Sequence, residues 1–210
     1  RSPRVNPDVS LRGDYGAFND LQKRIKASRD LFLVIGPPGT GKTSFGMLHT
    51  LQEELLEDDA RVLVVSYTNR SVDEICSKLY PKIDFIRLGG NVSFAETYSE
   101  RYLGSIVAEC KTSAELRDRV AAARVVVGTT SSAMSHLPLL SMDRYSLCII
   151  DEASQILEPH LLPLLSLCCA DGTPCISRFV MIGDHKQLPA VVQQRSRESR
   201  VDDPSLNAIG

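Results

Sequence analysis

The sequence predicts an α/β fold in which a parallel β-sheet is covered by helices on both faces. Short runs of branched apolar residues alternate with longer segments whose apolar residues recur at helical spacing. Several of the short runs are apolar throughout, which is typical of strands buried on both faces. This alternation, without an internal repeat, favours strand–helix–strand units that build one sheet.

Six segments are predicted to form the strands: residues 31–35, 61–67, 84–88, 124–130, 145–150 and 178–184. Helices are predicted for residues 18–25, 43–56 and 72–79, for two stretches within 93–123, and for 161–169. We expect Asn19 or Asp20 to cap the first helix, and Ser113 to cap the second helix of the 93–123 stretch. Short polar side chains at these positions can accept hydrogen bonds from the first free N–H groups of a helix.

The domain organisation predicted from these patterns is one main domain at residues 18–192, with a helical insertion at about 93–123. Residues 1–17 are polar and broken by prolines, so we expect a lead-in or a flexible segment. Residues 193–210 turn polar and carry no strand pattern, so we expect a linker.

The composition is that of a soluble globular protein, with 43% hydrophobic and 24% charged residues in a chain of 210. No apolar run approaches the roughly 20 residues of a membrane span, so no membrane association is expected. The formal net charge of −2 excludes a basic surface over the whole chain. Any nucleic-acid site must therefore be a local patch.

Six cysteines occur in the chain, at positions 76, 110, 148, 168, 169 and 175. They form no Cys-x-x-Cys pair, and most lie in apolar runs. We expect reduced thiols in the core in preference to metal ligands or disulfides. This indicates a reducing, intracellular location in the cytoplasm or nucleus.

A phosphate-binding loop is predicted directly after the first strand. Its residues are Gly36, Pro37, Pro38, Gly39, Thr40, Gly41, Lys42 and Thr43. The glycines let successive N–H groups point inward at an anion, and the helix that follows adds the positive end of its dipole. Lys42 would contact the β- and γ-phosphates of a nucleotide and Thr43 would bind Mg²⁺. The alternative is a glycine-rich turn into a helix, without a ligand.

A pair of carboxylates follows the strand at 145–150. Asp151 is placed to bind Mg²⁺, and Glu152 to orient and deprotonate a water that attacks the γ-phosphate. Adjacent carboxylates are otherwise common in solvated turns. The strand before them and the phosphate loop upstream favour the catalytic interpretation.

Two glutamines, Gln22 and Gln187, occupy positions from which their amides could contact a bound nucleotide. Gln22 lies about 20 residues before the phosphate loop and could donate to and accept from an adenine edge. In isolation, a surface glutamine on a helix is the more common interpretation. Gln187 follows the last strand and could sense the γ-phosphate, although a polar turn explains it equally well.

Polar residues also follow two other predicted strands. Thr68, Asn69 and Arg70 come after the second, while Thr129 and Thr130 end the fourth. Hydroxyls, amides and arginines contact phosphate and sugar without recognising base sequence. Taken alone, both segments would be ordinary loops.

Together these motifs resemble those of superfamily 1 helicases, specifically the Upf1-like group. The matching segments are residues 36–43, 68–73 (motif Ia), 127–130 (motif Ic), 151–155 (motif II) and 183–189 (motif III). The pairing of Asp-Glu-Ala-Ser-Gln with Gly-Asp-His-Lys-Gln-Leu-Pro is highly specific to that group, and the match covers about residues 18–192. The resemblance implies a RecA-like P-loop domain with Walker A and Walker B motifs.

The resemblance also implies an ATP-dependent helicase that moves 5′ to 3′ along single-stranded DNA or RNA. Gln22 would read adenine, Lys42 and Thr43 would bind phosphate and Mg²⁺, and Asp151 and Glu152 would be the magnesium ligand and the general base. Gln155 and Gln187 would couple the γ-phosphate to the strand, which Thr68, Asn69 and Thr129 would contact.

A second RecA-like domain is implied as the partner that closes the ATP site. It would supply an arginine finger, which is worth ~10³–10⁵ in rate. We therefore expect the present chain alone to bind nucleotide weakly and to hydrolyse it very slowly. Two alternatives stay open at this point: a small phosphoryl-transfer kinase, and a nucleotide-gated binding module without unwinding activity.

Overall fold

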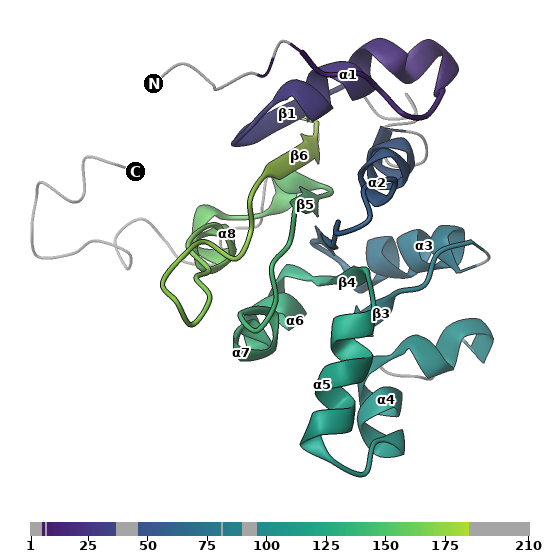
Figure 1. Cartoon of the computed structure of the whole chain (residues 1–210), viewed down its shortest axis with the longest axis vertical. Helices are drawn as coiled ribbons and strands as arrows, with labels where there is room; N and C mark the ends of the chain where they lie inside the picture. The colour runs from purple at the N-terminus through teal and green to yellow at the C-terminus, as the bar shows by residue number, and fades with distance from the viewer. Residues whose placement is uncertain (1–5, 7, 37–45, 81, 90–95, 185–210) are drawn as a thin grey trace, which may run out of the picture.

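A computed structural model describes residues 6, 8–36, 46–80, 82–89 and 96–184 of the chain. Its centre is a six-stranded sheet in the order β1-β6-β5-β2-β4-β3, in which every pairing is parallel (Figure 1). The strands are β1 (Leu31–Ile35), β2 (Val62–Ser66), β3 (Ile86–Leu88), β4 (Val125–Thr129), β5 (Leu147–Ile150) and β6 (Phe179–Gly183). All six predicted strands are thus confirmed.

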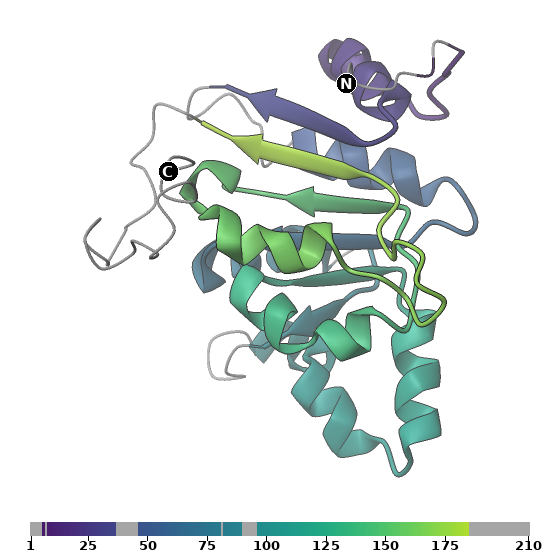
Figure 2. The ribbon, with the colours of Figure 1, turned by 90° about the vertical axis from the view of Figure 1, so that its left-hand side faces the viewer.

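Two layers of helices cover the sheet, as predicted. On one face lie α1 (Asn19–Ala27), α2 (Leu48–Leu55) and α3 (Asn69–Leu79), and on the other α4 (Leu103–Glu109), α5 (Ser113–Ala122), α6 (Thr130–Ser135), α7 (Leu137–Leu140) and α8 (Glu158–Leu165). Short 3₁₀ helices occur at Gly16–Phe18 (η1), Glu96–Arg101 (η4) and Ala153–Gln155 (η5). Figure 2 shows the sheet between the two layers.

Successive residues of the central strand β2 serve two separate cores. Val64 joins the cluster beneath α1, α2 and α3, whereas Leu63 and Val65 join the cluster beneath α4 to α8. All residues of β2 are buried. This explains why the strand is apolar throughout instead of alternating.

Strand β1 differs from the central strands because it ends the sheet. Val34 packs into the core, but Leu31, Leu33 and Ile35 are 41%, 54% and 62% exposed. The strand that leads into the phosphate loop therefore carries three partly exposed apolar side chains.

The caps of two helices differ from the prediction. Phe18 takes the N-cap position of α1, and Asn19 is the first helical residue. The Asn19 side chain instead accepts the Tyr15 N–H at 2.7 Å and donates to Asp14 at 2.8 Å, so it holds the preceding segment. Asp20 is likewise inside the helix, and the expected cap by either residue was wrong.

The cap of α5 is Thr112, one residue before the predicted Ser113. Its Oγ1 accepts the Glu115 N–H at 3.1 Å. Helix α3 also begins before its predicted start at residue 72, because Thr68 caps it. The two short helices α6 and α7 were not predicted, since no apolar periodicity marks segments of this length.

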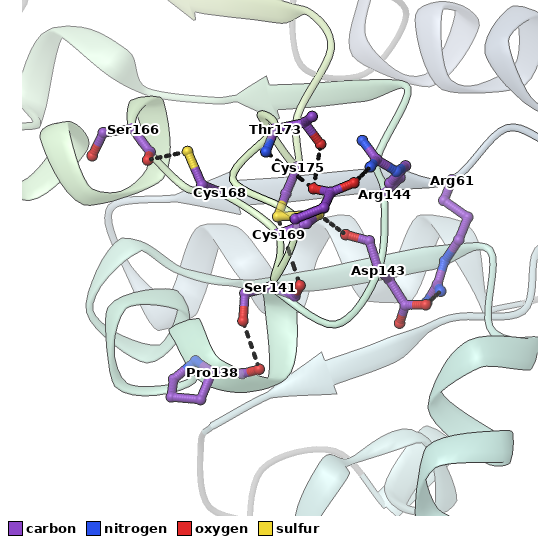
Figure 3. The surroundings of a disulfide bond; sticks show 11 residues. Arg61, Pro138, Ser141, Asp143, Arg144, Ser166, Cys168, Cys169, Thr173 and Cys175 are labelled. Carbon is purple, nitrogen blue, oxygen red and sulfur yellow. Dashed lines mark hydrogen bonds and ion pairs between the residues drawn. A yellow bond between two sulfur atoms is a disulfide. The ribbon is translucent and has the colours of Figure 1, made fainter.

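The predicted helix at 161–169 ends at Leu165, and a short disulfide-closed loop follows it. Cys169 and Cys175 form a disulfide (Figure 3), so the expectation of reduced thiols was wrong for these two. Within the loop the Cys169 N–H donates to the Thr173 carbonyl at 2.9 Å, and Asp171 pairs with Arg144 at 2.5 Å. These bonds favour a turn over a further helical turn.

The other described cysteines match the expectation more closely. Cys76 and Cys148 are free and fully buried, and burial raises the pKa of the Cys76 thiol to about 12. These two thiols are therefore protonated core residues at neutral pH. Within the described ranges, no helix is long and apolar enough to cross a bilayer.

Candidate nucleotide and nucleic-acid site

The carboxyl ends of all six strands meet at one edge of the sheet, because every pairing is parallel. The residues at or directly after these ends are Gly36 (β1), Gly183 (β6), Asp151 (β5), Ser66 (β2), Thr129 (β4) and Gly89 (β3). Ligands of such sheets bind outside the carboxyl ends of the strands. The sheet therefore gathers the predicted motifs at one edge, seen where the strand arrows point in Figure 2.

Backbone contacts join the segments that follow β1, β6 and β5. The Gly36 N–H donates to the Gly183 carbonyl at 3.3 Å, and the Asp184 N–H donates to Ser154 Oγ at 3.3 Å. A Cβ at Gly183 would lie 3.1 Å from the Ser154 nitrogen, so glycine permits this close approach. The start of the phosphate loop, motif II and motif III are thereby in direct contact.

Some predicted site residues lie outside the described part of the chain. These are Pro37, Pro38, Gly39, Thr40, Gly41, Lys42, Thr43 and Gln187. Their roles stay predictions.

Gln22 is a buried residue of α1, with an exposed fraction of 1%, so the interpretation as a surface glutamine was wrong. Its Nε2 donates to the Gly46 carbonyl at 3.2 Å, and its Oε1 accepts the Thr50 hydroxyl at 2.9 Å. These bonds place the amide at the start of the helix that follows the phosphate loop. A primary amide can make two further hydrogen bonds, through its second N–H and the second lone pair of its oxygen. An adenine contact through these groups stays a prediction.

Asp151 lies at the tip of β5 with an exposed fraction of 2%, which excludes a solvated turn. Its N–H donates to the Val65 carbonyl at 2.8 Å and so holds the residue against β2. Mg²⁺ prefers oxygen ligands and binds proteins through one or two carboxylates, with water and phosphate completing its shell. Asp151 is a buried carboxylate at this edge and fits that ion, and Asp184, directly after β6, is a second buried carboxylate there.

No denser metal site competes with Asp151 in the part of the chain that the structure describes. There, no group of three or more histidine, cysteine, aspartate or glutamate side chains could hold a metal ion.

Glu152 has a left-handed backbone conformation, which is strained for a residue other than glycine. Its φ of 53° and ψ of 34° are left-handed, and it is the one non-glycine residue with positive φ in the described ranges. Such a conformation costs on the order of 1–3 kcal/mol and persists where the surroundings impose it. The Glu152 carboxylate faces the end of β2 and the first turn of α3.

Two serines that sequence reasoning did not assign hold this carboxylate. Glu152 Oε2 accepts from Ser71 Oγ at 2.7 Å and from Ser66 Oγ at 3.3 Å. Ser66 is the last residue of β2, and Ser71 lies in the first turn of α3. Gln155 follows within η5, and its backbone N–H donates to the Glu152 carbonyl at 2.9 Å.

Motif Ia forms the start of α3. Thr68 Oγ1 caps the helix by accepting the Ser71 N–H at 3.1 Å, while Asn69 and Arg70 are exposed. The helix start contributes positive charge at this point, and Arg70 adds a full charge. An anionic strand could therefore bind here.

Motif Ic forms the start of α6 and is less accessible. Thr129 Oγ1 accepts the Ser132 N–H at 3.0 Å in a capping box, and its exposed fraction is 7%. Thr130 is only 1% exposed, whereas the following Ser131 is exposed. The predicted strand contacts of Thr129 and Thr130 stay predictions, and Ser131 is the accessible hydroxyl beside them.

The fold and the clustered motifs define a RecA-like nucleotide-binding domain. A family model described as "AAA domain" matches residues 17–114 and 95–195, and the chain belongs to that family. The similarities below also confirm the resemblance to superfamily 1 helicases of the Upf1-like group.

Two curated relatives support this placement. The chain is 36% identical over 194 residues to "DNA replication ATP-dependent helicase/nuclease DNA2" of Xenopus laevis, covering 90% of this chain and 17% of the relative. It is 36% identical over 201 residues to "DNA replication ATP-dependent helicase/nuclease JHS1" of Arabidopsis thaliana, covering 93% and 14%. The chain thus spans less than a fifth of these relatives.

Among solved structures, the UvsW helicase from bacteriophage T4 has a similar fold. Its TM-score is 0.53 at 14% identity, with 86% of this chain and 56% of that chain covered. At this identity the similarity concerns the fold alone.

Proposed function

We propose that this chain is the first motor domain of an ATP-dependent helicase, which couples ATP hydrolysis to movement along single-stranded nucleic acid. The observation that carries the proposal is the direct contact between motif II and motif Ia. The Glu152 carboxylate accepts a 2.7 Å hydrogen bond from Ser71, in the first turn of the helix that Thr68 caps. A group suited to hydrolysis and groups suited to a phosphate backbone thus share one network.

ATP would bind at the carboxyl edge beside β1. The loop 36–43 and Lys42 would hold the phosphates, and Gln22, beside the first turn of α2, would meet the adenine. Asp151 and Thr43 would hold Mg²⁺, which supplies charge neutralisation to the phosphates when it is bound. Glu152 would take the proton of the attacking water.

Two partners follow from this assignment. The exposed Asn69 and Arg70 favour a single strand of DNA or RNA, and the names of the relatives, which mention DNA replication, favour DNA. A second RecA-like domain of the same full-length protein would close the ATP site. Gln155 and Gln187 of the present chain would couple the γ-phosphate to the strand. We also propose an intracellular, nuclear location, which the mention of DNA replication in the relatives' names supports. The Cys169–Cys175 disulfide weakens the separate argument from reduced cysteines.

Steady-state ATP hydrolysis by the full-length protein, with and without single-stranded DNA or RNA, tests the proposal. A strand should stimulate hydrolysis strongly, and Glu152→Gln should lower it by ~10²–10⁴ while ATP still binds. A phosphorylated small molecule would instead support the kinase, and binding without turnover would support the binding module. Turnover on the order of 1 per second by residues 1–210 alone would contradict the need for a second domain.

A further inference from the structure

Arg87 is an arginine buried in the middle of β3, with 1% of its side chain exposed. Its neighbours Ile86 and Leu88 point into the core beneath α4 to α8. Because side chains alternate along a strand, Arg87 lies on the opposite face, beside α3. A buried guanidinium is costly unless each part of it is paired.

The partners of Arg87 come from three separate segments. Nε donates to Asp73 Oδ1 at 2.9 Å, and Nη2 lies 2.8 Å from the same oxygen. Nη1 donates to the carbonyls of Leu88 and Gly89, and the guanidinium carbon lies 5.0 Å from the centre of the Tyr102 ring. The residue therefore joins α3, the end of β3 and the chain just before α4.

The remaining contact reaches a predicted site residue. Arg87 Nη2 donates to Asn69 Oδ1 at 3.2 Å. A guanidinium has donors only, so the amide of Asn69 must turn its oxygen toward Arg87. The Nδ2 half of the amide is then directed away from Arg87 as a donor.

A donor in this position suits a phosphate oxygen. Asn69 is exposed and is the first residue of α3, an 11-residue helix whose N-terminus favours negative charge. If the amide were flipped, its oxygen would face the phosphate and repel it. The orientation of Asn69 is therefore decisive for binding, and a buried neighbour sets it.

We propose that Arg87 is a positioning residue for the nucleic-acid strand, because it fixes the amide of Asn69 with its N–H groups toward the phosphates. The inference rests on the proposed function and adds a residue that no strand touches. Its contact with Tyr102 extends the same network to the helices at 96–122, so that a displacement of those helices reaches Asn69 through one side chain.

The test is Arg87→Lys in the full-length protein. Lysine keeps the charge beside Asp73, but its single ammonium cannot also bridge Asn69 and two carbonyls. The concentration of single-stranded DNA that half-saturates ATPase stimulation should rise about tenfold, whereas kcat at saturating DNA should change less than twofold.

Arg61→Lys is a matched control at the opposite end of the sheet. Arg61 pairs with Asp143 at 2.7 Å, donates to the Val120 carbonyl at 2.8 Å and lies 5.5 Å from the Tyr145 ring. It loses the same kinds of contact on substitution, but it is remote from α3. Its half-saturating DNA concentration should equal that of the wild type.

A double-mutant cycle with Asn69→Ala separates positioning from a general loss of packing. Arg87→Lys should raise the half-saturating DNA concentration no further in the Asn69→Ala background. An equal rise in both backgrounds would overturn the inference, as would a wild-type response of the Arg87→Lys variant. A wild-type protein that neither binds nor responds to single strands would overturn the proposed function itself, and the inference with it.

Discussion

Ser71 Oγ donates to Glu152 Oε2 at 2.7 Å and lies 2.9 Å from Thr68 Oγ1. The predicted general base is therefore one hydroxyl away from a predicted contact of the nucleic-acid strand. A strand that takes the Thr68 hydroxyl would alter the hydrogen bonds of Ser71, and with them the freedom of the Glu152 carboxylate. These contacts would provide a physical route from the predicted strand binding to hydrolysis.

Ser71→Ala should therefore weaken the control of hydrolysis by the strand. Loss of the hydroxyl frees Glu152, so ATP hydrolysis without a strand should rise about threefold to tenfold, which corresponds to a typical net hydrogen bond of about 0.7–1.4 kcal/mol. The ratio of stimulated to basal rate should fall by the same factor. Steady-state rates with and without single-stranded DNA measure both quantities.

Ser77→Ala provides the control on the same helix, because Ser77 is exposed and its Oγ donates to the Asp73 carbonyl one turn earlier. Its basal and stimulated rates should match the wild type. An unchanged basal rate in Ser71→Ala would show that the hydroxyl does not restrain Glu152.

Gln22→Ala should reduce the preference for adenine nucleotides. The variant removes the buried amide beside the start of α2, so the KM for ATP should rise about tenfold while the KM for GTP stays the same. Thr50→Val is the control, since it removes the hydroxyl bound to Gln22 but leaves the amide. It should lower stability and retain the preference for ATP. Equal effects of Gln22→Ala on both nucleotides would contradict adenine recognition.

Gly183→Ala should separate the segments that follow β5 and β6. The added Cβ would lie 3.1 Å from the Ser154 nitrogen. This is a backbone atom, so it can move away only a little. We expect a loss of about 1–3 kcal/mol and a Tm lower by roughly 3–10 °C. Gly104→Ala in α4 meets no atom within 4 Å and should leave Tm unchanged or raise it slightly. Calorimetry of both variants compares the two sites.

The acid stability of the domain should depend on Glu53. Burial raises the pKa of this carboxyl, but hydrogen bonds from Lys26, from the N–H groups of Arg12 and Gly13 and from Tyr15 outweigh it and lower the pKa to about 2. A depressed pKa stabilises the fold above the unfolded value of 4.5. The contribution, about 3 kcal/mol, is lost as the pH falls from about 4.5 to about 2.

Glu53→Gln should therefore lower stability by about 2–3 kcal/mol at pH 7 and flatten its dependence on pH between about 4.5 and 2. Glu57→Gln is the control: Glu57 pairs with Arg12 and Lys26 but is 43% exposed, so its loss should cost under about 1 kcal/mol. Unfolding midpoints measured from pH 2 to 7 distinguish the variants. A Glu53→Gln profile parallel to the wild type would contradict the role of this carboxylate.

The strands could be predicted from the sequence because burial on both faces leaves a continuous apolar run. The motifs could be placed for a similar reason, since parallel strands bring their carboxyl ends to one edge. Local sequence patterns could not predict which residue caps a helix where tertiary contacts decide between the candidates. Asn19 has the chemistry of a cap, yet its amide satisfies Tyr15 and Asp14 instead.

Other features depend on residues far apart in the chain. Arg87 is the clearest case, because an arginine within a strand of three residues gives no sign of its contacts with Asn69 and Tyr102. The exposure of β1 was also invisible, since an apolar run does not reveal whether its strand ends the sheet. Cys169 pairs with Cys175 in a loop after α8, which ends at Leu165, whereas the sequence predicted a helix as far as residue 169.

If Glu152 is the general base as predicted, its left-handed backbone sets folding against catalysis at a single position. Glycine would adopt φ 53° without the steric cost of a side chain, so Glu152→Gly would relieve strain of about 1 kcal/mol or more. A mutational scan scored by folded yield would therefore prefer glycine there, and one scored by ATP turnover would reject it. The rankings of substitutions by folded yield and by ATP turnover would differ most at positions where a side chain serves the reaction but lowers the stability of the fold.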